Sequence, residues 1–126
     1  MPDLPPDVKD AIVLSVSDET TNLETGTAKT TFRMPFQFLL SEVRASVTTA
    51  PTGSVLTVDI NEGGTTILST KITIDATEKT SESAAVAPVI SDKNLADDAE
   101  MTIDIDTVGS TVPGAGLKVY LVGTQV

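Results

Sequence analysis

Hydrophobic and polar side chains alternate along several short stretches of this chain. In the segment 55–68, the apolar residues Leu56, Val58 and Ile60 are each separated by one polar residue. A period of two residues is typical of a β-strand with one face toward a core and the other toward water. The glycine pair Gly63–Gly64 then supplies backbone that tolerates positive φ, so we expect the chain to turn back there.

The same alternation, or a short apolar run bounded by turn residues, recurs along the whole chain. These patterns predict about eight short strands, at 12–17, 27–34, 42–48, 55–61, 71–75, 84–91, 100–108 and 117–122. Pro88 lies inside one of these segments and limits it to an edge strand, because proline has no N–H to donate to a central ladder. The polar segment 94–98 predicts at most one helical turn.

The aromatic residues locate the expected core. All three phenylalanines of the chain, Phe32, Phe36 and Phe38, lie in one short segment. Phe36, Phe38 and Leu40 form the most apolar patch of the sequence, and because all three phenylalanines lie at 32–38 we expect the centre of the core there. Short strands around one core, with no convincing helix, predict an all-β fold, namely an antiparallel, jelly-roll-like β-sandwich.

At 126 residues the chain has the length of one domain. We divide it into an extended, proline-rich N-terminal arm at 1–10 and a single β-sandwich domain at 11–126. Pro2, Pro5 and Pro6 disfavour a helix in the arm and favour an extended or polyproline path. Such a segment is usually a loose terminus. The alternative is an arm that orders against a partner, with Pro2, Leu4, Pro5 and Pro6 as its contacts.

The amino-acid composition excludes several classes of function. The net charge of −10 and an aromatic content of 3% argue against nucleic-acid binding, because phosphates repel such a chain and few side chains can stack on bases. The chain has no Cys and no His, and therefore lacks thiolate chemistry and the commonest general base. Because Cys and His are missing, we expect no enzymatic activity and no cofactor. No signal peptide or membrane-spanning apolar run is visible, so we expect a soluble protein without membrane contact.

One group of side chains could hold an ion. Four oxygen-bearing residues are expected on the outward faces of two strands: Asp59, Asn61, Asp104 and Asp106. Oxygen ligands of this kind suit Ca²⁺, which makes Asp59, Asp104 and Asp106 the candidate ligands. If the strands are neighbours, the carboxylates repel each other unless a cation, or Lys71 and Lys118 from adjoining strands, relieves the repulsion. A solvated acidic face is the commoner arrangement, and the spacing does not match an EF-hand loop.

Several stretches resemble a known family. They are TAKTTFRMP at 27–35, EVRAS at 42–46, APTGS at 50–54, the run 56–74 with VDINEGG and ILSTKITID, LADDAE at 95–100, TIDIDTVGST at 102–111 and GLKVYLVGT at 116–124. Together they cover about 12–124 and are similar to small structural and decoration domains of tailed bacteriophages, which also occur in tail and fibre proteins. The resemblance implies a jelly-roll-like sandwich.

The resemblance also implies a role in the virion. The first expectation is a capsid decoration, or cement, protein that binds the outer shell and is assembled in the host cytoplasm. Its partners would be the major capsid protein or other virion proteins, and it could form a homo-oligomer such as a trimer. The alternative is a receptor- or carbohydrate-binding module of a tail or fibre, against which the sparse aromatic residues count. A remnant hydrolase is the third and weakest hypothesis.

Overall fold

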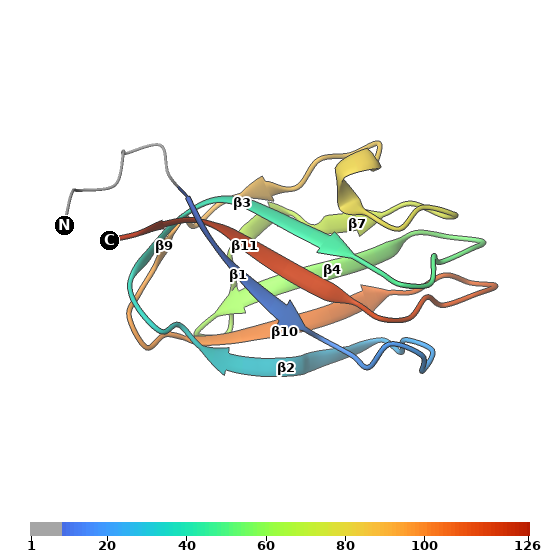
Figure 1. The fold of residues 1–126 in the computed structure, drawn as a ribbon, viewed down its shortest axis with the longest axis horizontal. Coiled ribbons are helices and arrows are strands. Elements are labelled where there is room, and N and C mark those ends of the chain that lie inside the picture. The colour runs from blue at the N-terminus through green and yellow to red at the C-terminus, as the bar shows by residue number, and fades with distance from the viewer. Residues whose placement is uncertain (1–8) are drawn as a thin grey trace.

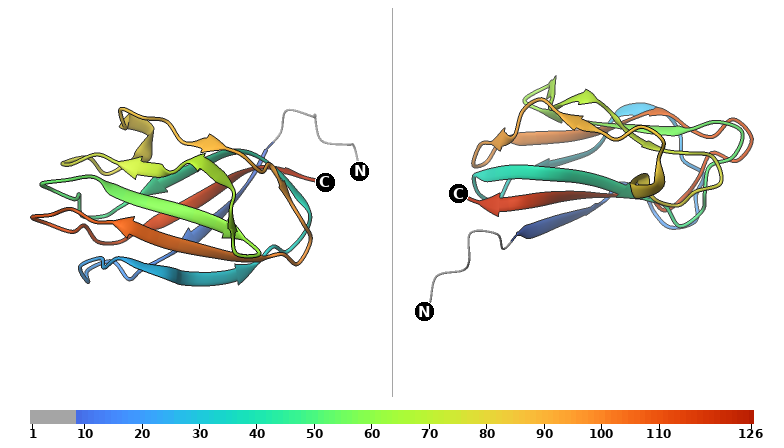
Figure 2. Two further views of the ribbon diagram at one scale, coloured as in Figure 1. Left: turned by 180° about the vertical axis from the view of Figure 1, so that it is seen from behind. Right: turned by 90° about the horizontal axis from the view of Figure 1, so that it is seen from above.

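Two antiparallel β-sheets face each other across one hydrophobic core in the computed structural model, which describes residues 9–126 (Figures 1 and 2). The first sheet has the strand order β1 (Asp10–Ser15), β11 (Lys118–Gln125), β3 (Phe38–Ser46) and β9 (Asn94–Leu95). The second has the order β2 (Gly26–Arg33), β10 (Glu100–Thr107), β4 (Leu56–Glu62) and β5 (Thr65–Thr66), and β7 (Ile72–Ile74) also pairs with β4. A small separate ladder joins β6 (Leu68–Thr70) to β8 (Val89–Ile90), and η1 (Ser81–Ser83) is a single 3₁₀ turn.

The order of the strands is that of a jelly roll. From β1 to β4 the chain changes sheet at each step, and the late strands β10 and β11 insert between early strands of the two sheets. β5 and β7 pair with successive parts of the same edge of β4, so the two sheets contain eight strand positions. The predicted all-β, jelly-roll-like sandwich of about eight strands is therefore confirmed. No helix in residues 9–126 is both long and apolar enough to cross a membrane.

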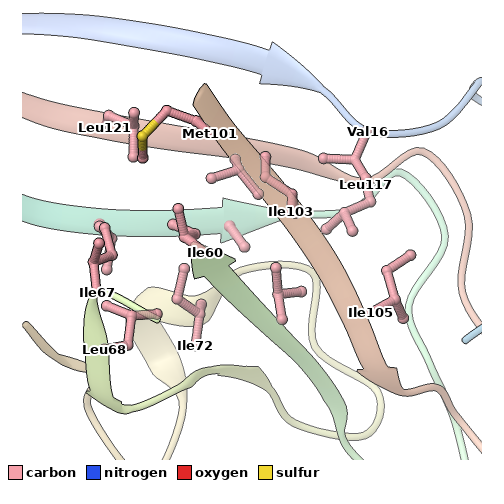
Figure 3. Close-up of a cluster of buried hydrophobic side chains, with 14 of the residues drawn as sticks. Val16, Ile60, Ile67, Leu68, Ile72, Met101, Ile103, Ile105, Leu117 and Leu121 are labelled. Carbon is pink, nitrogen blue, oxygen red and sulfur yellow. The ribbon is translucent and has the colours of Figure 1, made fainter. Parts of the chain in front are cut away.

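The core is built from the alternate residues that the sequence pattern predicts. Leu56, Val58 and Ile60 of β4 are fully buried. They meet residues of the opposite sheet such as Leu121, and Figure 3 shows how side chains from both sheets meet in one cluster. Because both inner faces are apolar, each sheet shields the other from water, which is the main stabilising contribution in such a sandwich.

The predicted centre of the core is part of this cluster. Met34, Phe38 and Leu40 are buried, whereas Phe32 and Phe36 are half-buried and pack against the cluster from outside. The rings of Phe36 and Phe38 lie 5.9 Å apart, between centroids. Phe38 and Leu40 belong to the same strand, β3, as the alternating segment that follows.

The segment 94–98 differs from its prediction. Instead of a helical turn, Asn94 and Leu95 form β9, which pairs with Phe38 and Leu39 at the start of β3. The side chain of Leu95 is fully buried. A ladder partner and a buried leucine together outweigh the weak local preference for a turn.

Candidate functional site

The four predicted ion-site residues lie on two neighbouring strands. β4 pairs with β10 so that Asp59 stands directly opposite Asp104 and Asn61 opposite Thr102. Asp106 lies near the end of β10. The structure thus brings the predicted residues together on one face of the second sheet.

Asp59, however, is buried, which corrects the expectation of an outward, wet face on β4. Only 5% of Asp59 is exposed, and Asn61 is also buried. The carboxylate Oδ1 of Asp59 accepts hydrogen bonds from the backbone N–H of Ile60 at 2.9 Å and from Thr66 Oγ1 at 2.5 Å. After the turn at Gly63–Gly64 the chain brings Thr66 back over this face. Asp59 therefore holds the end of β5 against β4, between the parts of β4 that pair with β5 and with β7.

Asp104 on β10 also accepts hydrogen bonds that hold neighbouring strands together. Its Oδ1 accepts from the backbone N–H of Ala28 at 2.8 Å, and its Oδ2 accepts from Asn61 Nδ2 at 2.9 Å. Ala28 has a φ of 49°, and the β2–β10 register shifts beside it. A non-glycine residue in the left-handed region costs about 1 kcal/mol. The carboxylate of Asp104 stabilises this bulge because it accepts the hydrogen bond of the displaced N–H of Ala28.

A lysine neutralises the carboxylates, as one of the predicted alternatives states. Lys71 Nζ lies 2.5 Å from Asp106 Oδ2 and 3.8 Å from Asp59 Oδ2. The hydrogen bond with Asp106, together with the charges of Asp106, Asp59 and Asp104, raises the pKa of Lys71 above its usual value. Lys118 does not take part, because its ammonium group pairs with Glu19. It is on β11, in the opposite sheet, so the prediction that it would face these acids was wrong.

This arrangement stabilises the fold rather than forming an open cation site. Each carboxylate of Asp59 and Asp104 is already engaged by backbone or side-chain donors, and Lys71 supplies the positive charge. Within residues 9–126, no group of three His, Cys, Asp or Glu side chains is placed to hold a metal ion.

The raised pKa of Lys71 predicts a loss of stability at alkaline pH. The folded protein binds this proton more tightly than the unfolded chain. The stabilisation is therefore complete below the ordinary lysine pKa of about 10.4 and is lost as the pH rises above it. At pH 7 we expect Lys71→Met to lower the free energy of unfolding by only about 1 kcal/mol, because 44% of the lysine side chain is exposed to solvent, which screens the interaction.

Urea unfolding at a series of pH values would measure this effect. The difference between the wild type and Lys71→Met should shrink above pH ~10. Lys79→Met, at an exposed lysine outside the cluster, is the matched control and should unfold like the wild type at each pH. A constant difference up to pH ~11 would contradict the assigned role of Lys71.

A hollow on the described surface lies along the edge of β3. It has a volume of about 460 Å³ and is lined on one side by Ser41, Glu42 and Val43 of β3 and on the other by residues of η1 and the segment 84–93. The wall of the 84–90 segment is mostly apolar, with Ala84, Ala87, Pro88, Val89 and Ile90. Val89 is half exposed there. We call this hollow the β3-edge groove.

Hydrogen bonds cover the edge of β3 at both ends of the groove. At one end, the N–H of Leu40 donates to the carbonyl of Lys93 at 2.8 Å. At the other, the N–H of Ala45 donates to Ser81 Oγ at 2.9 Å. Val43, which lies between them, is only 2% exposed, so its backbone is not open to solvent in the groove.

Charged side chains lie beside the groove. Arg44 Nε lies 2.6 Å from Glu42 Oε1 and 3.1 Å from Glu82 Oε1. The hydrogen bond from Arg44 lowers the pKa of Glu42, and the same contact raises the pKa of Arg44. Lys93 lies near the opposite end of the groove, where its carbonyl covers Leu40. Arg44 is therefore already paired with two glutamates, and both of these glutamates line the groove.

Sequence reasoning did not find this groove. Its walls come from β3 and from the segment 84–93, which are far apart in the sequence, and no motif links them. The only available signal was Pro88, which predicts that the segment around it cannot be a central strand. The other predicted contact residues, Pro2, Leu4, Pro5 and Pro6, lie outside the described residues.

Comparison with known proteins adds no assignment: no protein-family model, no curated protein and no solved structure matches this chain.

Proposed function

We propose that this chain is a non-enzymatic structural protein of a tailed-phage particle, and specifically a capsid decoration protein that binds the outer shell. The observation that carries the proposal is the resemblance of 12–124 to small phage structural domains. The jelly-roll sandwich of residues 9–126 is the fold that the resemblance implies.

The placement of the polar residues supports a role in binding a partner protein rather than in catalysis. The clustered carboxylates are engaged in holding β4, β5 and β10 together. An acidic exterior, with a net charge of −10, keeps such a protein soluble until it meets its partner. The partner we propose is the major capsid protein, contacted through the N-terminal arm and one side of the sandwich.

Removing the arm tests this proposal. Deletion of residues 1–8 leaves β1 intact, because β1 begins at Asp10. We expect the shortened protein to keep its thermal unfolding midpoint but to occupy purified shells at least tenfold more weakly, since an arm of restricted conformation contributes contacts at low entropic cost. Co-sedimentation with shells, over a range of protein concentrations, measures the occupancy.

A chain with the same eight residues in scrambled order is the matched control, because it keeps length and charge. It should decorate shells as weakly as the deletion. Normal decoration by the deletion would show that the arm has no role. Failure of the full chain to bind any shell, together with specific binding on a glycan array, would favour the tail or fibre module instead.

A further inference from the structure

β1 lies at the rim of the first sheet and has one unpaired edge (Figure 1). Within residues 9–126 it pairs only with β11. The N–H of Val16 donates to the carbonyl of Leu117 at 2.9 Å, which continues the β1–β11 register by one residue. Because alternate residues of an antiparallel strand direct their backbone groups to the same side, the residues between those that face β11 point the other way. Ala11, Val13 and Ser15 therefore direct their N–H and C=O groups away from the sheet.

These three residues are open to solvent. All of them are exposed, and Val13 is 55% exposed. No hydrogen bond from residues 9–126 reaches their backbone on the outer side. From Ala11 to Ser15 the strand has no charged residue, proline or glycine. An edge of this kind is a template on which another strand can form a ladder.

The other edges of the described sandwich are protected against such pairing. β2, at the edge of the second sheet, carries Lys29 and Arg33 and is bulged at Ala28. The strands β5 to β9 are only two or three residues long. Charges, bulges and short strands are the usual means by which proteins keep an edge from pairing. Among the described edge strands, β1 alone combines length with an uncharged edge.

We propose that β1 pairs with β1 of a second copy of this chain, antiparallel across a two-fold axis at Val13, so that their first sheets join into one. This inference does not depend on the virion role proposed above.

The backbone of β1 is its own complement in this register. A two-fold axis at Val13 places Val13 opposite Val13 of the second copy, and Ala11 opposite Ser15. Each of these pairs exchanges both of its backbone hydrogen bonds, because all three residues direct their N–H and C=O groups outward. An axis at Ile12 would instead place Ser15 opposite Lys9, which lies outside the strand. Val13 is therefore the centre that uses every outward residue of β1.

The side chains fit the same register. Ile12 and Leu14 are half-buried and pack against the core at the rim of the sandwich. With the axis at Val13, Ile12 lies opposite Leu14 of the second copy, so each covers apolar surface that the other leaves in water. On the outer face, the exposed Val13 meets its own copy, next to Tyr120 of β11. No charged side chain lies between Ala11 and Ser15, so no like charges face each other along the pair.

The contact has the size of a weak, reversible dimer. One pair of such strands is about 20 Å long, which is smaller than the interface of a permanent dimer. Each copy also has a net charge of −10, so the copies repel each other at low salt. We expect a dissociation constant of roughly 0.1 mM and tighter association at high salt, because salt screens the repulsion. Since both copies use the same surface, the association ends at a dimer.

Sedimentation of the protein alone tests the proposal. The sedimentation coefficient should rise from that of a monomer to that of a dimer as the protein concentration passes through ~0.1 mM. The chain lacking residues 1–8 should dimerise equally, whereas the proposed shell attachment needs those residues, so failure of one proposal is distinguishable from failure of the other. A chain that stays monomeric at millimolar concentration, or a dimer that requires residues 1–8, would overturn the inference.

Two valines of equal exposure give a matched pair of variants. Val13 is 55% exposed and Val86, which lies outside any strand, is 56% exposed. Val13→Lys places two like charges at the axis and should weaken dimerisation at least tenfold. Val86→Lys makes the same change in net charge and should leave dimerisation unchanged. Both variants should keep the thermal unfolding midpoint of the wild type, and equal dimerisation by the two would contradict the assigned contact.

A cysteine at the axis tests the register. The chain has no Cys, so one substitution gives a single thiol per copy. Opposite residues that exchange backbone hydrogen bonds have Cα atoms ~5.5 Å apart, a separation that a disulfide spans. Val13→Cys should therefore form a covalent dimer on mild oxidation at least tenfold faster than Val86→Cys. Equal rates for the two variants would show that Val13 does not lie at the axis.

Discussion

Phe38→Ala should lower the free energy of unfolding by about 3–5 kcal/mol, the largest effect we expect from a single substitution in this protein. The ring of Phe38 is fully buried, and its strand position pairs with Leu95 of β9 and with Gln125 of β11. Truncation to alanine leaves a cavity where two neighbouring strands hold the backbone in place, so the site cannot easily collapse. Urea denaturation followed by circular dichroism measures the change.

Leu39→Ala is the matched control, because Leu39 is the next residue of the same strand and is 45% exposed. Its loss should cost about 0.5 kcal/mol or less. Similar effects for the two substitutions would mean that the inner and outer faces of β3 are wrongly assigned.

Gly123→Ala should be the second most damaging substitution described here, with a loss of about 3 kcal/mol. Gly123 lies where the β11–β3 register shifts, and a methyl group there would lie 2.2 Å from the carbonyl oxygen of Leu39 and 2.9 Å from Phe38 Cε2. Backbone atoms of a central ladder cannot move aside cheaply. The same register shift makes Ser41 the extra residue of β3, so distortion here should also disturb the β3-edge groove.

Gly64→Ala separates the effect of crowding from that of backbone conformation. A methyl group at Gly64 meets no atom within 4 Å, but the φ of 86° disfavours alanine. We expect a loss of about 1 kcal/mol from this strain alone. Thermal unfolding should therefore rank Gly123→Ala well below Gly64→Ala in stability, and the reverse order would show that the ladder tolerates the added carbon.

Much of the fold follows from local pattern. Leu56, Val58 and Ile60 alternate with polar residues, and they are buried as that period requires. The predicted turn at Gly63–Gly64 connects β4 to β5 in the structure. A period-two pattern determines which side chains face a core whatever the partner strand is, and this is why the all-β class and the sandwich could be predicted.

The candidate ion site could be predicted only in part from this pattern. The sequence placed Asp59 and Asp104 on polar faces, and the structure pairs their strands directly. It could not show that Thr66 returns over Asp59 or that Asp104 caps the bulge at Ala28. The first contact depends on the path of the chain after the turn at Gly63–Gly64, and the second depends on the register shift between β2 and β10. Neither feature produces a periodic pattern in the sequence.

By itself, then, the order of residues determined the class of fold, the inward face of each long strand and the acidic exterior, because these depend on side-chain period and composition. Only the tertiary structure decided which strands are neighbours, that Lys71 rather than Lys118 meets the clustered acids, and that β3 and the segment 84–93 line one groove. Pairing between distant segments is selected by the packing of the whole core, and no single stretch of sequence contains that information.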